Sequence, residues 1–108
     1  MGRARGYGQI CPLAKAAELL CERWTLLVVR ELCMGSRRYA ELRRGIPLIS
    51  PTMLSQRLRE LEDGGVVRRI RPRGAREKGT GSAEYVLTAA GDELGGVLEQ
   101  LSVWGHRW

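Results

Sequence analysis

The stretch that decides the fold runs from Tyr39 to Thr88 and combines two helical patterns with two strand patterns. In order, it contains YAELRRGIP (39–47), ISPTMLSQRLRELE (49–62), VVRRI (66–70) and EYVLT (84–88). Pro47 closes a turn after the first segment. Ser50 followed by Pro51 is a typical helix start, because a serine side chain caps free N–H groups and proline needs no N–H there. The order predicts a helix, a turn, a second helix and a two-stranded hairpin.

This order is that of a winged helix-turn-helix, whose second helix enters the DNA major groove while the hairpin, or wing, reaches the flanking backbone. In the second helix, Leu54, Leu58 and Leu61 share one face and are expected in the core. The opposite face and its flanks carry side chains that bond base edges or phosphates. We therefore predict that the following residues contact DNA: Ser50, Thr52, Met53, Ser55, Gln56, Arg57 on the backbone flank, and Arg59. A solvated polar face is the alternative.

Positive charge is concentrated in the same part of the chain. Residues 37–78 hold twelve Arg/Lys and five Asp/Glu, whereas residues 79–108 hold one and four. The whole chain carries a formal net charge of +6, and a basic face of this kind is typical of a polyanion binder. We expect contacts with the DNA backbone or minor groove from Arg37, Arg38, Arg68, Arg69, Arg71, Arg73, Arg76 and Lys78. A solvated loop without contacts is the alternative.

Three further helices are expected, at about 12–21, 24–34 and 89–108. The second of these is apolar around most of its circumference and is expected at the centre of the core, with Leu26, Leu27, Val28, Val29 and Leu32. Tyr39 and Leu42 should point inward from the short helix at 39–45. The fold class is mainly α with a small β-hairpin (α+β). A chain of 108 residues suits one domain, at 11–108, with a flexible arm at 1–10 and the wing at about 66–88.

Five segments carry a resemblance to a known family: CPL (11–13), ERWTLLVVREL (22–32), YAELRRGIP (39–47), ISPTMLSQRLRELE (49–62) and EYVLT (84–88). They are similar to the HxlR-type winged-helix transcriptional regulators of bacteria, relatives of the MarR group, over about residues 10–108. The resemblance implies a sequence-specific regulator that binds double-stranded DNA as a homodimer, with its first and last helices packed across a two-fold axis. Two departures stand out: Leu48 replaces the usual glycine of the turn, and the wing is longer and more basic.

The final helix supports the homodimer, because its apolar stripe is larger than a small domain is expected to cover alone. The expected interface residues are Leu13, Leu94, Val97, Leu98, Leu101, Trp104 and Trp108. A two-fold dimer predicts a pseudo-palindromic operator with half-sites separated by whole helical turns. The alternative is a helix folded onto its own core. A small-molecule effector at this interface, near Trp24, Trp104 and Trp108, is a further hypothesis, with ordinary core packing as its alternative.

Cys11, Cys21 and Cys33 form no CxxC pair, so we expect no metal site, no disulfide framework and no cofactor. Some relatives in the family sense oxidants through a cysteine just before the first helix, and Cys11 matches that position. A helix N-terminus stabilises a thiolate, so Cys11 is a candidate redox residue. A plain capping or buried cysteine is the alternative. Cys21 and Cys33 lie on apolar helices and are expected in the core.

An enzyme is not expected, because His106 is the only histidine and no paired carboxylates or phosphate-binding loop accompany it. No secretory signal is visible and no apolar run is long enough to cross a membrane, so a cytoplasmic protein is expected. The alternative to a DNA-binding regulator is a winged-helix module that contacts protein or RNA.

Overall fold

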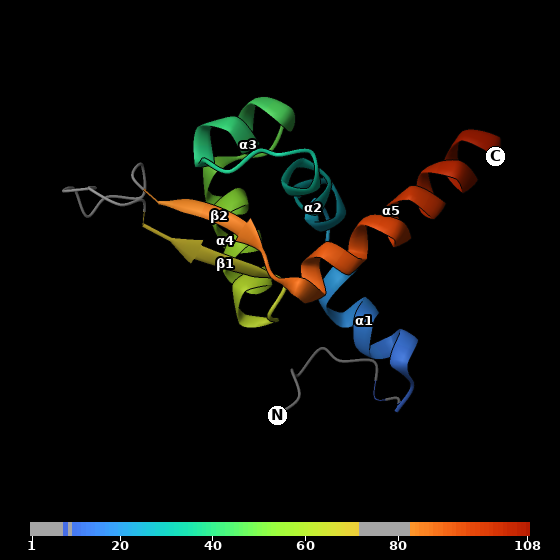
Figure 1. The fold of residues 1–108 in the computed structure, drawn as a ribbon. Helices are drawn as coiled ribbons and strands as arrows, with labels where there is room; N and C mark the ends of the chain where they lie inside the picture. The colour runs from blue at the N-terminus through green and yellow to red at the C-terminus, as the bar shows by residue number, and fades with distance from the viewer. Residues whose placement is uncertain (1–7, 9, 72–82) are drawn as a thin grey trace.

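The structure is a computed structural model that describes residues 8, 10–71 and 83–108. Residues 1–7 and 9 of the predicted arm and the wing residues Arg73, Arg76 and Lys78 therefore lie outside the described residues. The described part contains five helices and one two-stranded hairpin (Figure 1). In chain order these are α1 (Pro12–Leu20), α2 (Thr25–Cys33), α3 (Tyr39–Gly45), α4 (Pro51–Asp63), β1 (Val67–Ile70), β2 (Glu84–Leu87) and α5 (Ala89–Arg107). The mainly helical winged helix-turn-helix fold is confirmed.

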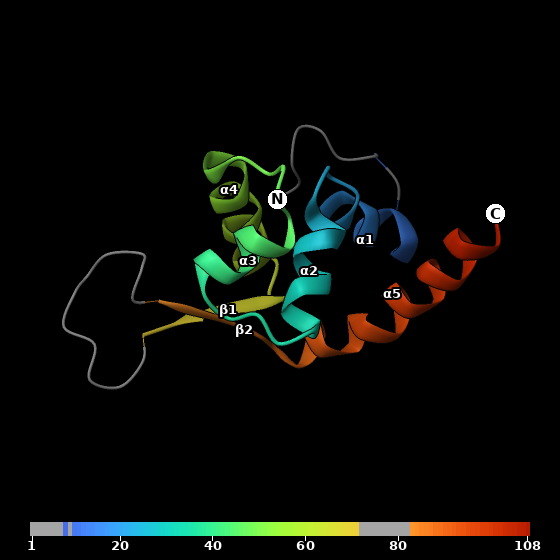
Figure 2. The same cartoon turned by 90° about the horizontal axis from the view of Figure 1, so that it is seen from above.

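Helix α2 occupies the centre of the molecule, between the α3–α4 pair and α5 (Figures 1 and 2). Its residues Val28, Val29 and Leu32 are buried, and so are Leu42, Ile46, Ile49, Leu54, Leu58, Leu61, Val66, Val67 and Tyr85 from the surrounding elements. The leucine face predicted for α4 is therefore confirmed. The expectation that Leu26 and Leu27 lie in the core with the rest of α2 was only partly right, because Leu27 is 38% exposed and Leu26 is half-buried. Helix α2 buries one broad face and leaves a strip to solvent.

The hairpin is antiparallel and connects the helix-turn-helix to α5. Val67 pairs with Leu87 at its base, and Ile70 pairs with Glu84 at its outer end. The segment before α3 also joins the sheet edge, because the amide of Tyr85 donates to the Arg37 carbonyl at 2.8 Å. Figures 1 and 2 show the hairpin projecting from one side of the molecule and the C-terminal half of α5 from the other.

Helix α5 starts in close contact with the base of the hairpin. The Thr88 hydroxyl caps the helix by accepting from the Gly91 amide at 3.2 Å, and it donates to the Gly65 carbonyl at 2.6 Å. A Cβ on Gly91 would lie 2.3 Å from the Val66 carbonyl oxygen. Only a glycine therefore allows the first turn of α5 to approach β1 this closely.

The backbone angles of the residues that precede α2 and α4 show how the connections to these two helices are built. Helix α2 begins at Thr25 rather than Trp24, because Trp24 is its N-cap and adopts a left-handed backbone with φ 81°. Leu48 does not need the backbone that favours glycine, since Trp24 is the one non-glycine residue with positive φ among the described residues. The Leu48 side chain is instead 87% exposed.

The prediction that Cys21 and Cys33 lie in the core was wrong for the single chain, because both are exposed. Cys21 follows the last residue of α1 and Cys33 is the last residue of α2, so each lies beyond the buried part of its helix. Burial that is only partial, together with the nearby Asp92 carboxylate, raises the pKa of the Cys33 thiol.

Candidate nucleic-acid interface

The outer face of α4 is the centre of the candidate interface. Thr52, Gln56 and Arg59 are exposed on this face, opposite the buried leucines, as the periodicity predicted. Ser50 is also exposed and caps the helix, because its Oγ accepts from the Met53 amide at 3.1 Å. Ser50, Thr52 and Gln56 belong to the N-terminal half of the helix, which is the part that reads base edges in helix-turn-helix proteins, and Arg59 follows about one turn further along.

Tyr39 fixes the start of α4 against α3. Its hydroxyl donates to the Pro51 carbonyl at 2.7 Å and accepts from the Ser55 hydroxyl at 3.4 Å. Ser55 is consequently half-buried and turned toward α3, and Met53 packs partly against the core. Met53 and Ser55 therefore present less surface to a ligand than the four exposed residues of this helix.

The position of the Arg57 side chain differs from the sequence prediction. It was expected to contact the DNA backbone from the flank of α4, but it is only 7% exposed. Its Nε donates to the Arg23 carbonyl at 2.8 Å, and Nη1 donates to both carboxylate oxygens of Glu60 at 2.9 and 3.1 Å. Nη2 lies 4.0 Å from the Glu22 carboxylate. Position 57 is three residues after Leu54, on the buried side of α4, so this guanidinium points into the molecule.

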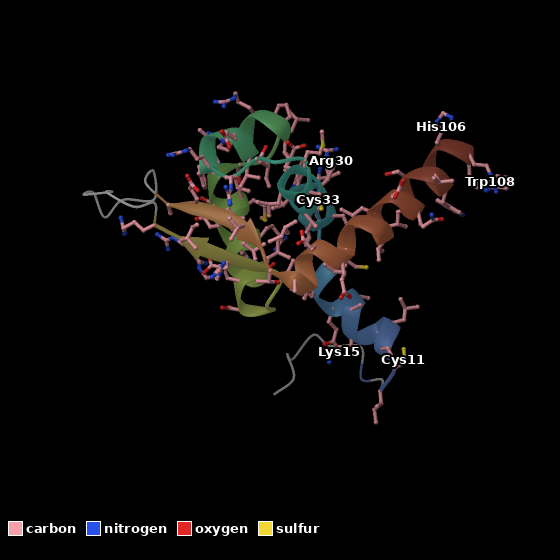
Figure 3. The ribbon with its side chains drawn as sticks, in the orientation of Figure 1. Cys11, Lys15, Arg30, Cys33, His106 and Trp108 are labelled. Atoms are coloured by element: carbon pink, nitrogen blue, oxygen red, sulfur yellow. The ribbon has the colours of Figure 1, made fainter. Side chains whose placement is uncertain are left out.

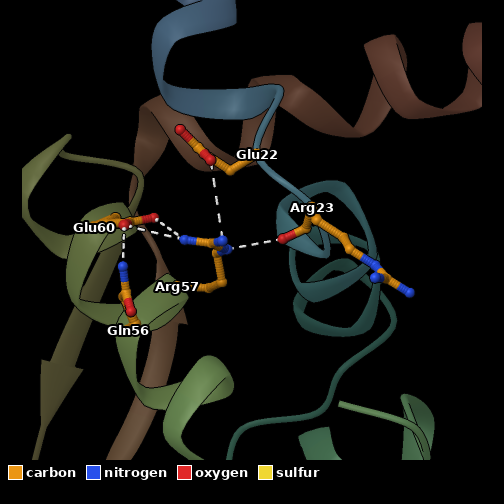
Figure 4. A network of polar contacts seen from close by, with 5 residues as sticks. All are labelled: Glu22, Arg23, Gln56, Arg57 and Glu60. Atoms are coloured by element: carbon orange, nitrogen blue, oxygen red, sulfur yellow. Dashed lines mark hydrogen bonds and ion pairs between the residues drawn. The ribbon is translucent and has the colours of Figure 1, made fainter. Parts of the chain in front are cut away.

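Glu60 connects this buried contact to the exposed face. The same carboxylate that binds Arg57 also accepts from Gln56 Nε2 at 3.2 Å (Figure 4). Sequence reasoning missed both roles of Glu60. The sequence did contain evidence for these contacts, because Glu60 is three residues after Arg57 and four after Gln56. Side chains at these spacings are neighbours on a helix surface.

The two arginines before α3 are exposed, but one of them already has a partner. Arg38 Nη2 lies 3.2 Å from the carboxylate of Glu84, the first residue of β2 in the hairpin. Glu41 caps α3 by accepting from the Arg37 and Arg38 amides at 2.8 and 3.0 Å. These two hydrogen bonds lower the pKa of the Glu41 carboxyl. The cap orders the segment that carries both arginines.

The wing contributes cations on both faces. Arg68 and Arg69 are exposed on β1, where they stand opposite Val86 and Tyr85. Successive side chains of a strand point to opposite faces, so one of them faces each side of the hairpin. Arg71 is exposed at the end of β1. The described part of the wing therefore extends the basic surface beyond α4.

A second surface, apolar rather than basic, lies at the other end of the molecule. Figure 3 shows Cys11 on α1 and Trp108 at the end of α5, both far from the hairpin. Leu13 is 78% exposed, Trp104 65% and Trp108 82%, and Val97 and Leu101 are about half exposed. Leu94 and Leu98 differ from the rest of the expected interface, because they pack partly against the core of the same chain.

Cys11 occupies the N-cap of α1 and is exposed, as expected from its place before the helix. Its Sγ accepts a hydrogen bond from the Ala14 amide at 3.1 Å. An open pocket of about 480 Å³ lies beside it, lined by Ile10, Cys11, Pro12, Lys15 and Glu18. The sulfur is therefore reachable from solvent, with an ammonium group one turn along the helix.

The described residues contain no cluster of three or more side chains suited to a metal ion, and no helix long and apolar enough to cross a membrane. A winged helix-turn-helix with an exposed polar face on its second helix and a basic wing defines the class of DNA-binding transcriptional regulators. Residues 19–108 match the HxlR-like helix-turn-helix family, and the chain belongs to that family. This is a family of transcriptional regulators and not of enzymes.

Several relatives extend over almost the whole chain. The HTH-type transcriptional regulator YvaP of Bacillus subtilis (strain 168) is 37% identical over 102 residues, which cover 93% of this chain and 90% of YvaP. The quinone-bound structure of YodB from B. subtilis superposes with a TM-score of 0.71 at 32% identity, covering 92% of this chain and 100% of YodB. The redox regulator HypR in its oxidised form superposes with a TM-score of 0.78 at 30% identity, covering 91% of this chain and 97% of HypR.

Proposed function

We propose that this protein regulates transcription by binding a pseudo-palindromic operator as a homodimer. The observation that carries the proposal is the outer face of α4, where Thr52, Gln56 and Arg59 are exposed together. Glutamine bonds adenine and arginine bonds guanine bidentately, while threonine suits either type of base. The arginines before α3 and on β1 would then hold the phosphates on either side, which sets the register of the protein on the duplex.

The apolar surface of α1 and α5 supports the homodimer. Trp104 and Trp108 are mostly exposed on a helix that projects away from the body of the domain. Isolated apolar residues are common on protein surfaces, but large aromatic side chains that share a helix with the half-exposed Val97 and Leu101 are typical of an interface. A two-fold pair of domains would present two α4 helices to successive major grooves.

Selection of bound duplexes from a random pool tests the operator. With reduced protein at near-physiological salt, we expect a pseudo-palindrome with two half-sites. Gln56→Ala should relax the preference at one position of each half-site, because one bidentate base contact is lost. Recovery of no motif, with binding that vanishes as salt rises, would instead favour a winged-helix module that contacts protein or RNA.

We further propose that oxidants or electrophiles reach the regulator through Cys11. The support is its exposed sulfur beside an open pocket, together with relatives whose structures are the quinone-bound YodB and the oxidised HypR. Release of operator DNA after treatment with diamide or a quinone is the measurement. We expect Cys11→Ser to abolish the release and Cys33→Ser to leave it intact. A full response in Cys11→Ser would contradict the proposal.

A further inference from the structure

We infer that Arg57 is a positioning residue that sets the orientation of α4 for base recognition without touching DNA. The inference rests on the proposed function, since it concerns how α4 is held for operator reading. Its starting point is that the guanidinium of Arg57 makes all its described contacts inside the protein, with Arg23, Glu60 and Glu22 (Figure 4).

The contacts of Arg57 are directional, like the hydrogen bonds of Tyr39 at the start of α4, whereas the leucine packing of this helix is not. Leu54, Leu58 and Leu61 hold α4 through apolar contacts, which favour burial but fix rotation about the helix axis only loosely. The hydrogen bond from Nε to the Arg23 carbonyl has a defined length and angle, at 2.8 Å. The rigid guanidinium therefore fixes the rotation of α4 about its axis more closely than leucine packing does.

The other end of this contact is well anchored. Arg23 belongs to the short connection between α1 and α2, next to the left-handed Trp24. The Arg23 side chain lies over the Trp24 ring, 4.8 Å from the centroid, while its carbonyl points to Arg57 (Figure 4). Arg57 thus ties α4 to a segment that is held independently by the core.

The contact lies nearly opposite the surface that would read DNA. At about 100° per residue, Arg57 is roughly 160° around the helix from Arg59. A helix turns as a rigid body, so a rotation of α4 about its own axis after loss of Arg57 would turn the outer face by the same angle. Glu60 also links Arg57 directly to the outer face of α4, because its carboxylate accepts from both Arg57 and the Gln56 amide. Loss of Arg57 should affect every base contact of the half-site together.

The experiment compares Arg57→Met with Arg59→Met, which removes the same charge from the same helix at an exposed position. Each variant is scored for affinity to the selected operator, to all single-position operator variants and to random duplex. We expect Arg57→Met to lower the ratio of specific to random binding by about tenfold, the loss expected when a bidentate base contact is misplaced. The loss should spread over the half-site, and the salt slope should stay unchanged. Arg59→Met should lose discrimination at one position.

A second measurement needs no DNA. Residual dipolar couplings of the free protein give the rotation of α4 about its own axis relative to α2, which should change in Arg57→Met and stay unchanged in Arg59→Met. Glu60→Gln, which keeps the guanidinium and shortens no side chain, should show a smaller change in the same direction. The ratio of specific to random binding is insensitive to a reduced folded fraction, so a less stable variant remains informative.

The outcomes separate the two proposals. An unchanged rotation of α4, unchanged discrimination, or a salt slope lower by about one, as for a lost phosphate contact, would each overturn the positioning role. If the unmodified protein selects no sequence, the proposed function fails. The dipolar couplings would then still decide whether Arg57 orients α4.

Discussion

At the scale of single residues, Arg57 shows how a charged side chain occupies a buried position of a helix. Removing one partner of a buried ion pair costs about 3–5 kcal/mol when the other charge stays buried. Glu60 and Glu22 keep 25% and 34% of their side-chain surface exposed, so water can still solvate both carboxylates when Arg57 is replaced, and the cost is lower. We expect Arg57→Met to lower the free energy of unfolding by about 1–3 kcal/mol in urea titrations. Arg59→Met should change it by less than about 0.5 kcal/mol.

The cap of α3 makes a residue-scale prediction about pH. The Arg37 and Arg38 amides hold the pKa of Glu41 below its ordinary value of 4.5. A folded pKa below the unfolded value means that the charge stabilises the fold above pH 4.5 and that this contribution is lost as pH falls through the folded pKa. Glu41→Gln should therefore be less stable than the unmodified protein at pH 7. The difference should shrink below pH 4.5 in unfolding experiments, and a constant difference would contradict the assignment.

At the scale of elements, local signals were sufficient for the helix-turn-helix. Ser50, Pro51 and the leucine spacing predicted α4 correctly, because caps and periodicity depend on neighbouring residues only. The spacing from Leu54 places position 57 near the buried side of α4. The partners Glu22 and Arg23, which satisfy the buried guanidinium, come from another part of the chain, and no pattern within α4 reveals them. For the same reason, the exposure of Cys21 and Cys33 could not be read from their apolar surroundings in the sequence.

The junction of the hairpin with α5 makes an element-scale prediction. In Gly91→Ala, the new methyl group would lie 2.3 Å from the Val66 carbonyl and 2.9 Å from Leu87 Cδ2, so the first turn of α5 must shift. We expect a loss of about 1–3 kcal/mol in unfolding free energy, despite the better helix propensity of alanine. Gly96 is the matched control in the same helix, since a Cβ there meets nothing within 4 Å of the described chain. Gly96→Ala should be neutral or stabilise by up to about 1 kcal/mol.

At the scale of the whole molecule, the basic and apolar surfaces lie at opposite ends, with the hairpin on one side and the projecting half of α5 on the other. In the proposed homodimer, this separation would let two copies join through α1 and α5 while both α4 helices stay accessible. It also predicts that association and DNA contact can be altered separately. A charge placed on α5 should weaken operator binding only because it weakens the pairing of two half-site readers.

Trp104→Glu tests that separation. Trp104 is 65% exposed on α5, and a carboxylate in an apolar interface would remain desolvated without a partner. Sedimentation equilibrium should show the mass falling from two chains to one, and affinity for a full operator should fall to that for an isolated half-site. Leu48→Glu is the control, because Leu48 is an equally apolar residue, 87% exposed, but lies in the turn before α4. Its mass should stay that of two chains, whatever its effect on DNA. An unmodified protein that sediments as one chain at micromolar concentration would rule out the α1–α5 interface, and the operator would then need only one half-site.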